Sequence, residues 1–147
     1  MGKTVFVIHT SAVIWDTVRD LFAEYAPDVT VRNILDDSLL PEVLAHGGVT
    51  PGVTRRLCEY AIQAEGSGAD LVFTQCSSVG EAADIAATMI NIPLVKIDER
   101  MAETACNKGT RVGVVATVQT TMGPTVRLIE RTATKLGKNV TVIEELS

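Results

Sequence analysis

The sequence from residue 69 to residue 81 reads Ala-Asp-Leu-Val-Phe-Thr-Gln-Cys-Ser-Ser-Val-Gly-Glu. The apolar residues Leu71, Val72 and Phe73 are consecutive, which is typical of a strand that is covered on both faces. Ser78 and Glu81 have the S-x-x-E spacing of a capping box, which marks a helix start. This stretch therefore predicts a buried strand that leads directly into a helix, with Cys76 at the junction.

The same alternation of short apolar runs and helix-period segments extends in both directions from this stretch. Strands are predicted at residues 4–9, 29–34, 69–74, 92–97, 111–116 and 140–144. Helices are predicted from about residue 11 to residue 25, and at 54–65, 79–90, 99–107 and 122–136, with a loop around Asp36, Asp37, Gly47 and Gly48.

Repetition of strand, helix and strand predicts the α/β class: a parallel sheet with helices on both faces, in a Rossmann-like arrangement. The segment from Arg111 onward restarts the pattern of residues 4–34. We therefore expect a first α/β domain at residues 1–98 and the start of a second, similar but incomplete domain at residues 99–147.

Composition limits the classes of partner. The chain has 147 residues, of which 46% are apolar and 21% charged, enough to build a core without disulfides or metal. A net charge of −5 argues against a nucleic acid or an anionic membrane surface as partner and favours a small molecule. No run reaches the roughly 18 apolar residues of a membrane span, and no signal peptide is recognisable, so we expect a cytoplasmic protein.

The three cysteines, Cys58, Cys76 and Cys106, have none of the paired spacings of a zinc site or a disulfide framework, so free thiols are expected. His9 and His46 lack a metal-ligand spacing, and neither glycine-rich phosphate-binding motif is present. The residues therefore predict neither a metal nor a nucleotide cofactor.

Ligands of open parallel sheets bind beyond the carboxyl ends of the strands. Cys76 lies at such an end and precedes a helix N-terminus, whose N–H groups and dipole stabilise a thiolate and also bind carboxylate or phosphate. The alternative is that Cys76 is an inert buried thiol, as cysteines often are. Core packing is the better interpretation for Cys58 and Cys106, which lie within helices.

Two further junctions carry polar groups. Thr117, Thr120 and Thr121 follow the strand at 111–116, and Pro124 fits the first turn of the next helix. These hydroxyls suit an anion, although Thr120 or Thr121 could simply be the helix N-cap. Residues 9–11, His-Thr-Ser, follow the first strand; there Ser11 could be an N-cap, and His9 either a partly buried histidine or a ligand contact.

Three segments together resemble the aspartate/glutamate/hydantoin racemase superfamily. Residues 71–78 are similar to its first cysteine motif, residues 111–117 with Thr120 to the strand and hydroxyl cluster that open its second domain, and residues 92–103 to the segment that joins the two halves. The resemblance covers essentially the whole chain. It implies a cofactor-independent racemase or isomerase, in which two cysteines on opposite faces of a substrate carbon act as base and acid.

The resemblance implies that Cys76 is one of these cysteines and that the substrate is a small carboxylate. A proton next to a carboxylate is weakly acidic, so its removal needs an activated base and donors that hold the carboxylate. The expected substrate-binding hydroxyls belong to Thr10, Ser11, Ser77, Ser78, Thr117, Thr120 and Thr121.

The chain departs from the family pattern at two places. Ser77-Ser78 stands where many members carry Asn-Thr, and His9-Thr10 stands where glutamate racemases carry Asp-Ser. The acid, and the choice between racemisation, another isomerisation and decarboxylation, therefore stay open. The rival hypothesis is a non-catalytic domain that binds small carboxylate anions on the same scaffold.

Family chains continue further and bring their second cysteine late in the second domain, so we expect this chain to be a truncated form without two-base activity as a monomer. The strand at Val112–Val115 is predicted to be buried on both faces, and its missing neighbours would leave an uncovered edge. We therefore expect a homo-oligomer that associates through residues 111–147.

Overall fold

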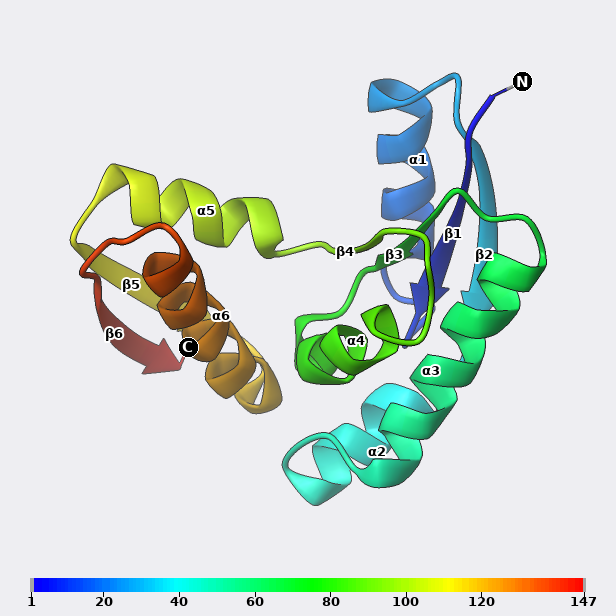
Figure 1. Ribbon diagram of the computed structural model, residues 1–147. Coiled ribbons are helices and arrows are strands. Elements are labelled where there is room, and N and C mark those ends of the chain that lie inside the picture. The colour runs from blue at the N-terminus through cyan, green and yellow to red at the C-terminus, as the bar shows by residue number, and fades with distance from the viewer. Residues whose placement is uncertain (1, 147) are drawn as a thin grey trace. The chain divides into compact units, whose positions relative to one another are not determined.

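The structure of the protein is a computed structural model that describes residues 2–146. The chain divides into two compact units, residues 1–96 and 97–147 (Figure 1).

The first unit is built on a four-stranded sheet. Its strands are β1 (Thr4–His9), β2 (Thr30–Leu35), β3 (Leu71–Thr74) and β4 (Leu94–Lys96). Their order is β2-β1-β3-β4, and every pair is parallel. This sheet confirms the predicted α/β class.

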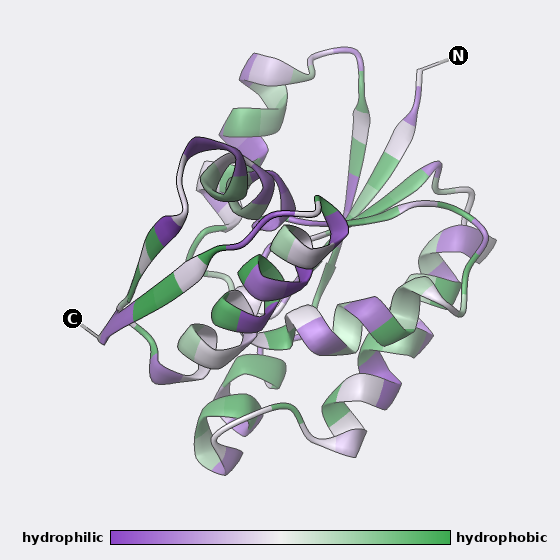
Figure 2. Cartoon of the chain, turned by 60° about the vertical axis from the view of Figure 1, so that its left-hand side comes forward, coloured by the Kyte–Doolittle hydropathy of each residue, from purple (hydrophilic) through white to green (hydrophobic). Residues whose placement is uncertain are grey.

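Helices cover both faces of this sheet, because alternate strand residues point to opposite sides. On one face α1 (Trp15–Tyr25) packs its Val18 against Val5 and Val7, and Phe22 meets Phe73 edge to face at 5.7 Å between ring centroids. On the other face lie α2 (Leu39–His46), α3 (Pro51–Gly66) and α4 (Gly80–Ala87). In Figure 2 the middle strands are mainly hydrophobic, whereas the helices mix both kinds of residue.

The helix α2 is a correction to the sequence analysis, which predicted a loop around residues 36–48. It spans only 8 residues and contains a proline, Pro41, so its periodicity is weak. It ends at Gly47, whose φ of 69° is the left-handed conformation that favours glycine. The next helix, α3, begins with Thr50 as N-cap and Pro51 in the first turn, three residues before the predicted start at Thr54.

The start of α1 was also predicted wrongly. The helix begins at Trp15, not near Ser11, and no side chain caps it. Among the apolar side chains of α1, Val18 is buried, but Leu21 and Tyr25 are 47% and 75% exposed. The helix therefore covers the sheet with a narrower stripe than the sequence pattern suggests.

The second unit contains α5 (Glu99–Lys108), β5 (Arg111–Ala116), α6 (Gln119–Lys135) and β6 (Thr141–Leu146). The strands β5 and β6 are parallel and form a two-stranded sheet. One core cluster joins the two helices to one face of this sheet, with Cys106, Val114 and Ile129 among its buried members.

The opposite face of the β5–β6 sheet is exposed. Val115 is 67% exposed and Ile143 is 47% exposed. The prediction that Val112–Val115 is buried on both faces is therefore wrong for this structure, in which only one face is covered. Among residues 2–146, no helix combines the length and the apolar content that crossing a membrane requires.

Candidate active site

The strand order of the first unit creates a place where a ligand can bind. After β1 the chain crosses to β2 on one side, and after β2 it crosses to β3 on the other side of β1. Ligands of parallel sheets bind in the crevice beyond the carboxyl ends of the strands at such a switch point. Ile8 pairs with Thr74 in the β1–β3 register, so residues 9–11 and 75–78 leave the sheet at the same edge.

Cys76 lies at this edge, in extended conformation (φ −128°, ψ 115°), immediately before a 3-10 helix at Ser77–Val79. The α-helix α4 follows at Gly80, with Val79 as its N-cap and no side-chain cap. The α-helix therefore begins one residue after the start at residue 79 that was predicted from the capping box, because a tighter 3-10 turn occupies Ser77–Val79. Cys76 still precedes a helix N-terminus, as predicted.

The three thiols have different surroundings. Cys76 is half-buried against the core of the first unit. Cys58 also packs on that core, and burial raises the pKa of its thiol. Cys106 is 2% exposed, and its Sγ donates to the carbonyl oxygen of Ile129 at 3.5 Å. Core packing therefore accounts for Cys58 and Cys106.

Four predicted hydroxyls share the edge with Cys76. Thr10 is 1% exposed and Ser78 2% exposed, whereas Ser11 and Ser77 are half-buried. The Ser11 Oγ accepts a hydrogen bond from the N–H of Val13 at 3.2 Å. It closes a turn in the loop before α1 and does not cap the helix.

The other predicted hydroxyls belong to the second unit, at the junction of β5 and α6. Thr117 is exposed, Thr120 is 8% exposed and Thr121 is half-buried. The helix begins at Gln119 with Val118 as N-cap, so neither threonine is the cap, and Pro124 lies in the second turn rather than the first. The structure therefore distributes the predicted site residues over two units.

His9 ends β1 and is 1% exposed. Its ring stacks on Trp15, with centroids 4.6 Å apart, and its Nε2 lies 2.9 Å from Oδ1 of Asn33. This histidine is thus fixed between α1 and β2 at the same edge as Cys76.

The model of the Asp/Glu/hydantoin racemase family matches residues 5–145. The chain belongs to this family. No curated protein sequence matches it. Two solved structures show that this racemase-family chain has the fold of glutamate racemases.

The first is glutamate racemase from Aquifex pyrophilus, with a TM-score of 0.69 and 16% identity; the match covers 96% of this chain and 54% of that one. The second is glutamate racemase from Francisella tularensis subsp. tularensis SCHU S4 in complex with D-glutamate, with a TM-score of 0.67 and 13% identity; it covers 99% of this chain and 53% of that one. This family member thus spans about half the length of either racemase.

The sequence analysis did not predict one charged pair at this edge. Lys96, the last residue of β4, is 5% exposed, and its Nζ lies 2.5 Å from Oδ1 of Asp84 on α4. A lysine inside the apolar run at residues 92–97 was the available signal. Its partner could not be predicted, because the pairing depends on how α4 lies across β4.

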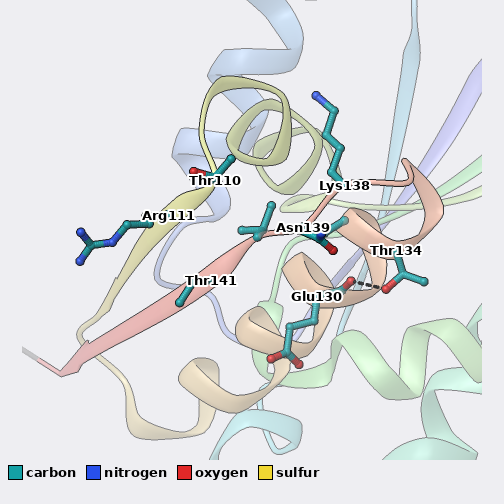
Figure 3. Close-up of a pocket in the computed structure, with 9 residues that line it drawn as sticks. Thr110, Arg111, Glu130, Thr134, Lys138, Asn139 and Thr141 are labelled. Carbon is teal, nitrogen blue, oxygen red and sulfur yellow. Dashed lines mark hydrogen bonds between the residues drawn. The ribbon is translucent and has the colours of Figure 1, made fainter.

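A cavity of about 500 Å³ lies elsewhere, in the second unit, at the amino ends of β5 and β6. Figure 3 shows Arg111, Lys138 and Glu130 on its rim with their charged groups pointing away from one another. Thr134 donates to the carbonyl oxygen of Glu130 at 3.0 Å. The charged groups on this rim therefore do not point toward a common ligand position. Within residues 2–146 no group of three His, Cys, Asp or Glu side chains is arranged to hold a metal ion.

Proposed function

We propose that this chain carries the proton-transferring cysteine of a racemase-family site, with Cys76 acting on the carbon next to the carboxylate of a small acid. The observation that carries the proposal is the position of Cys76 at the switch point of a parallel sheet, before a helix N-terminus. The family match over residues 5–145 supports a racemase-type activity for the site.

The chemistry requires no cofactor in this proposal. The thiolate of Cys76 takes the proton from the substrate carbon and becomes a thiol, while the electron pair left on carbon delocalises into the carboxylate. The thiol exchanges this proton with solvent, and return of a solvent-derived proton from the thiol to that carbon completes the exchange and regenerates the thiolate. Hydrogen-bond donors that face the carboxylate stabilise the charge that develops on it.

The first-unit donors in this proposal are the hydroxyls of Thr10, Ser11, Ser77 and Ser78, together with N–H groups at the helix start. Thr117, Thr120 and Thr121 are the proposed anion-binding hydroxyls of the second unit. A small carboxylate as substrate is supported by the Francisella tularensis glutamate racemase, which was solved with D-glutamate.

Proton exchange at carbon tests the proposal, because one base suffices for it whereas racemisation needs two. A panel of small amino and hydroxy acids is incubated with the protein in D2O, and deuterium at the carbon next to the carboxylate is measured by proton NMR. We expect exchange by the wild type and by Cys58→Ser, and loss of exchange in Cys76→Ser, whose hydroxyl is too weak an acid to serve as the resting base. Exchange by Cys76→Ser at the wild-type rate would refute the assignment.

A second candidate function is a carboxylate-binding domain without catalysis. It is favoured by the packing of Cys58 and Cys106 into the two cores, which leaves Cys76 as the cysteine at the sheet edge among residues 2–146. Saturable binding of an acid by calorimetry, with no deuterium incorporation at any carbon, would establish this function instead.

A further inference from the structure

The outer face of the β5–β6 sheet is the face that α5 and α6 leave uncovered. Alternate residues of a strand point to opposite sides, and the core of the second unit takes Val114 and Ala116 of β5. The opposite side of the two strands carries six exposed residues: Arg111, Gly113, Val115, Thr141, Ile143 and Glu145. Both faces of a parallel sheet are normally covered, so within residues 2–146 this sheet lacks one layer.

The register arranges these six residues in three rows across the strands. The rows are Arg111 with Thr141, Gly113 with Ile143, and Val115 with Glu145. The positive charge therefore lies at the amino end of β5 and the negative charge at the carboxyl end of β6. Four residues of strand, about 13 Å, separate the two ends, so the two charges do not meet within one chain.

The middle of this face is apolar and open. Val115 is 67% exposed and Ile143 is 47% exposed. A Cβ built on Gly113 would meet no other atom within 4 Å, so nothing stands over the centre of the face. Apolar surface of this kind gains free energy when a second layer removes it from water.

We propose that a second copy of this chain covers the face, packed sheet on sheet about a two-fold axis that crosses the strands at Gly113 and Ile143. Packed sheets lie about 10 Å apart, a distance that interdigitating side chains fill. The axis reverses the strand direction, so Arg111 of each copy lies opposite Val115 of the other. Glu145 is the register neighbour of that valine, one strand spacing of about 4.8 Å away.

This arrangement pairs opposite charges twice. At each end of the interface the guanidinium of Arg111 meets the carboxylate of Glu145 from the other copy, and the aliphatic stem of the arginine covers Val115. An axis parallel to the strands would instead place the two copies of Arg111 side by side, and likewise the two copies of Glu145. The face is therefore complementary in charge to itself, in the antiparallel orientation, which favours a second copy as its occupant.

The apolar residues supply the affinity of this interface and the charges supply its orientation. Exposed ion pairs add little free energy, whereas like charges placed together are strongly unfavourable. The interface uses residues of the second unit alone, so it does not depend on whether Cys76 is catalytic.

Charge-reversal variants of the full chain test the arrangement, with dimer dissociation constants measured by sedimentation equilibrium. Arg111→Glu and Glu145→Arg each create two like-charge contacts, so each should raise the dissociation constant by about tenfold or more. The double variant restores both pairs and should regain the wild-type constant. Arg32→Glu makes the same change of net charge at an exposed position of β2 in the first unit and should leave the constant unchanged.

A mixture of the two single variants gives a second readout. One chain then presents two acidic groups on the face and the other presents two basic groups. Equimolar Arg111→Glu and Glu145→Arg chains should therefore form a mixed dimer more tightly than either variant associates with itself. Formation of the mixed dimer also shows that both variants are folded.

A wild-type chain that stays monomeric at high concentration, or association that both single variants leave unchanged, would overturn the proposed interface. Weakening by both single variants without recovery in the double variant or in the mixture would overturn the pairing of Arg111 with Glu145. An equal effect of Arg32→Glu and Arg111→Glu would show that net charge, and not this face, controls association.

Discussion

Lys96 and Asp84 join the last residue of β4 to the helix that follows Cys76, with 2.5 Å between Nζ and Oδ1. The lysine is 5% exposed, whereas the aspartate is 38% exposed. Loss of the partner should therefore cost more free energy at the lysine than at the aspartate. Only the aspartate can be hydrated without a movement of its side chain.

Removal of Asp84 is expected to cost more stability than removal of Lys96. Asp84→Ala leaves a buried ammonium without a partner and should lower the free energy of unfolding by about 3 kcal/mol, whereas Lys96→Met, which retains the apolar stem, should cost about 1 kcal/mol. Urea denaturation measures both. The double variant should be more stable than Asp84→Ala alone, and a double variant less stable than either single one would contradict this account.

The phenol of Tyr60 is expected to lose its proton at a higher pH than an ordinary tyrosine does. Tyr60 donates to Oδ2 of Asp36 at 2.7 Å, and burial together with this carboxylate raises the pKa of Tyr60 to about 12. In a Tyr25→Phe background, where Tyr60 is the remaining tyrosine, the ultraviolet absorbance of the phenolate reports it alone. Asp36→Asn should lower the midpoint, because the neighbouring negative charge is removed. A midpoint near 10 in the background variant would contradict the contact.

The same pair predicts how stability varies with pH. Burial alone would raise the pKa of Asp36, but hydrogen bonds from Ser38 and Tyr60 and the charge of Arg56 outweigh it and lower the pKa. The contribution of Asp36 is therefore present above its unfolded pKa of about 3.9 and is lost as pH falls through the folded value. The contribution of Tyr60 is present below about pH 10 and is lost as pH rises toward 12. In Tyr60→Phe the alkaline loss should be smaller, as urea midpoints at pH 9 and pH 11 would show.

The N-cap of α3 should contribute measurably to stability. Thr50 Oγ1 accepts from the N–H of Val53 at 3.1 Å and donates to Oε1 of Glu42 at 2.6 Å, which links α3 to α2. Thr50→Ala should cost about 1–2 kcal/mol, whereas Thr50→Ser, which retains the hydroxyl, should cost little. If thermal unfolding showed that Thr50→Ser is as destabilising as Thr50→Ala, the methyl group of Thr50 and not its hydroxyl would account for its contribution to stability.

Sequence periodicity was sufficient to predict the bounds of some helices and strands but not of others. The strands β1 and β5 have the predicted bounds, because short apolar runs stand between clear breaks. The helix α2 was missed because 8 residues give too few turns for a pattern. The position of Cys76 at a strand-to-helix junction could be predicted from the local sequence. The contacts of His9 with Asn33 and Trp15 could not, because they depend on how β2 and α1 pack on β1.

The exposed face of the β5–β6 sheet is expected to promote self-association. Val115 and Ile143 lie on this face, and uncovered apolar strand surface recruits another chain. Val115→Thr with Ile143→Thr retains β-branched side chains while reducing the apolar area, and should lower the apparent mass in light scattering at high protein concentration. Val13→Thr, at an 88% exposed position of the first unit, is the matched control and should change nothing. Association that persists in the double variant would assign the interface elsewhere.

Iodoacetamide at neutral pH is expected to modify Cys76 before the other two cysteines. Alkylation requires a thiolate that the reagent can reach. Burial raises the pKa of Cys58 and so lowers its thiolate fraction, and Cys106 is 2% exposed with its thiol donating to a carbonyl oxygen. Cys76 is half-buried and lies immediately before the 3-10 helix that precedes α4. We expect its rate to exceed theirs by about tenfold.

Peptide mapping by mass spectrometry identifies the modified residue at each time point. Cys76→Ser should abolish the fast phase, Cys58→Ser should retain it, and in urea the three cysteines should react alike, because unfolding removes the differences in burial. An acid that binds at the sheet edge should slow the fast phase, since a ligand bound beside Cys76 hinders access of the reagent to its sulfur. If Cys58 were modified first in the folded protein, Cys76 would not be the most reactive cysteine, and this prediction would be wrong.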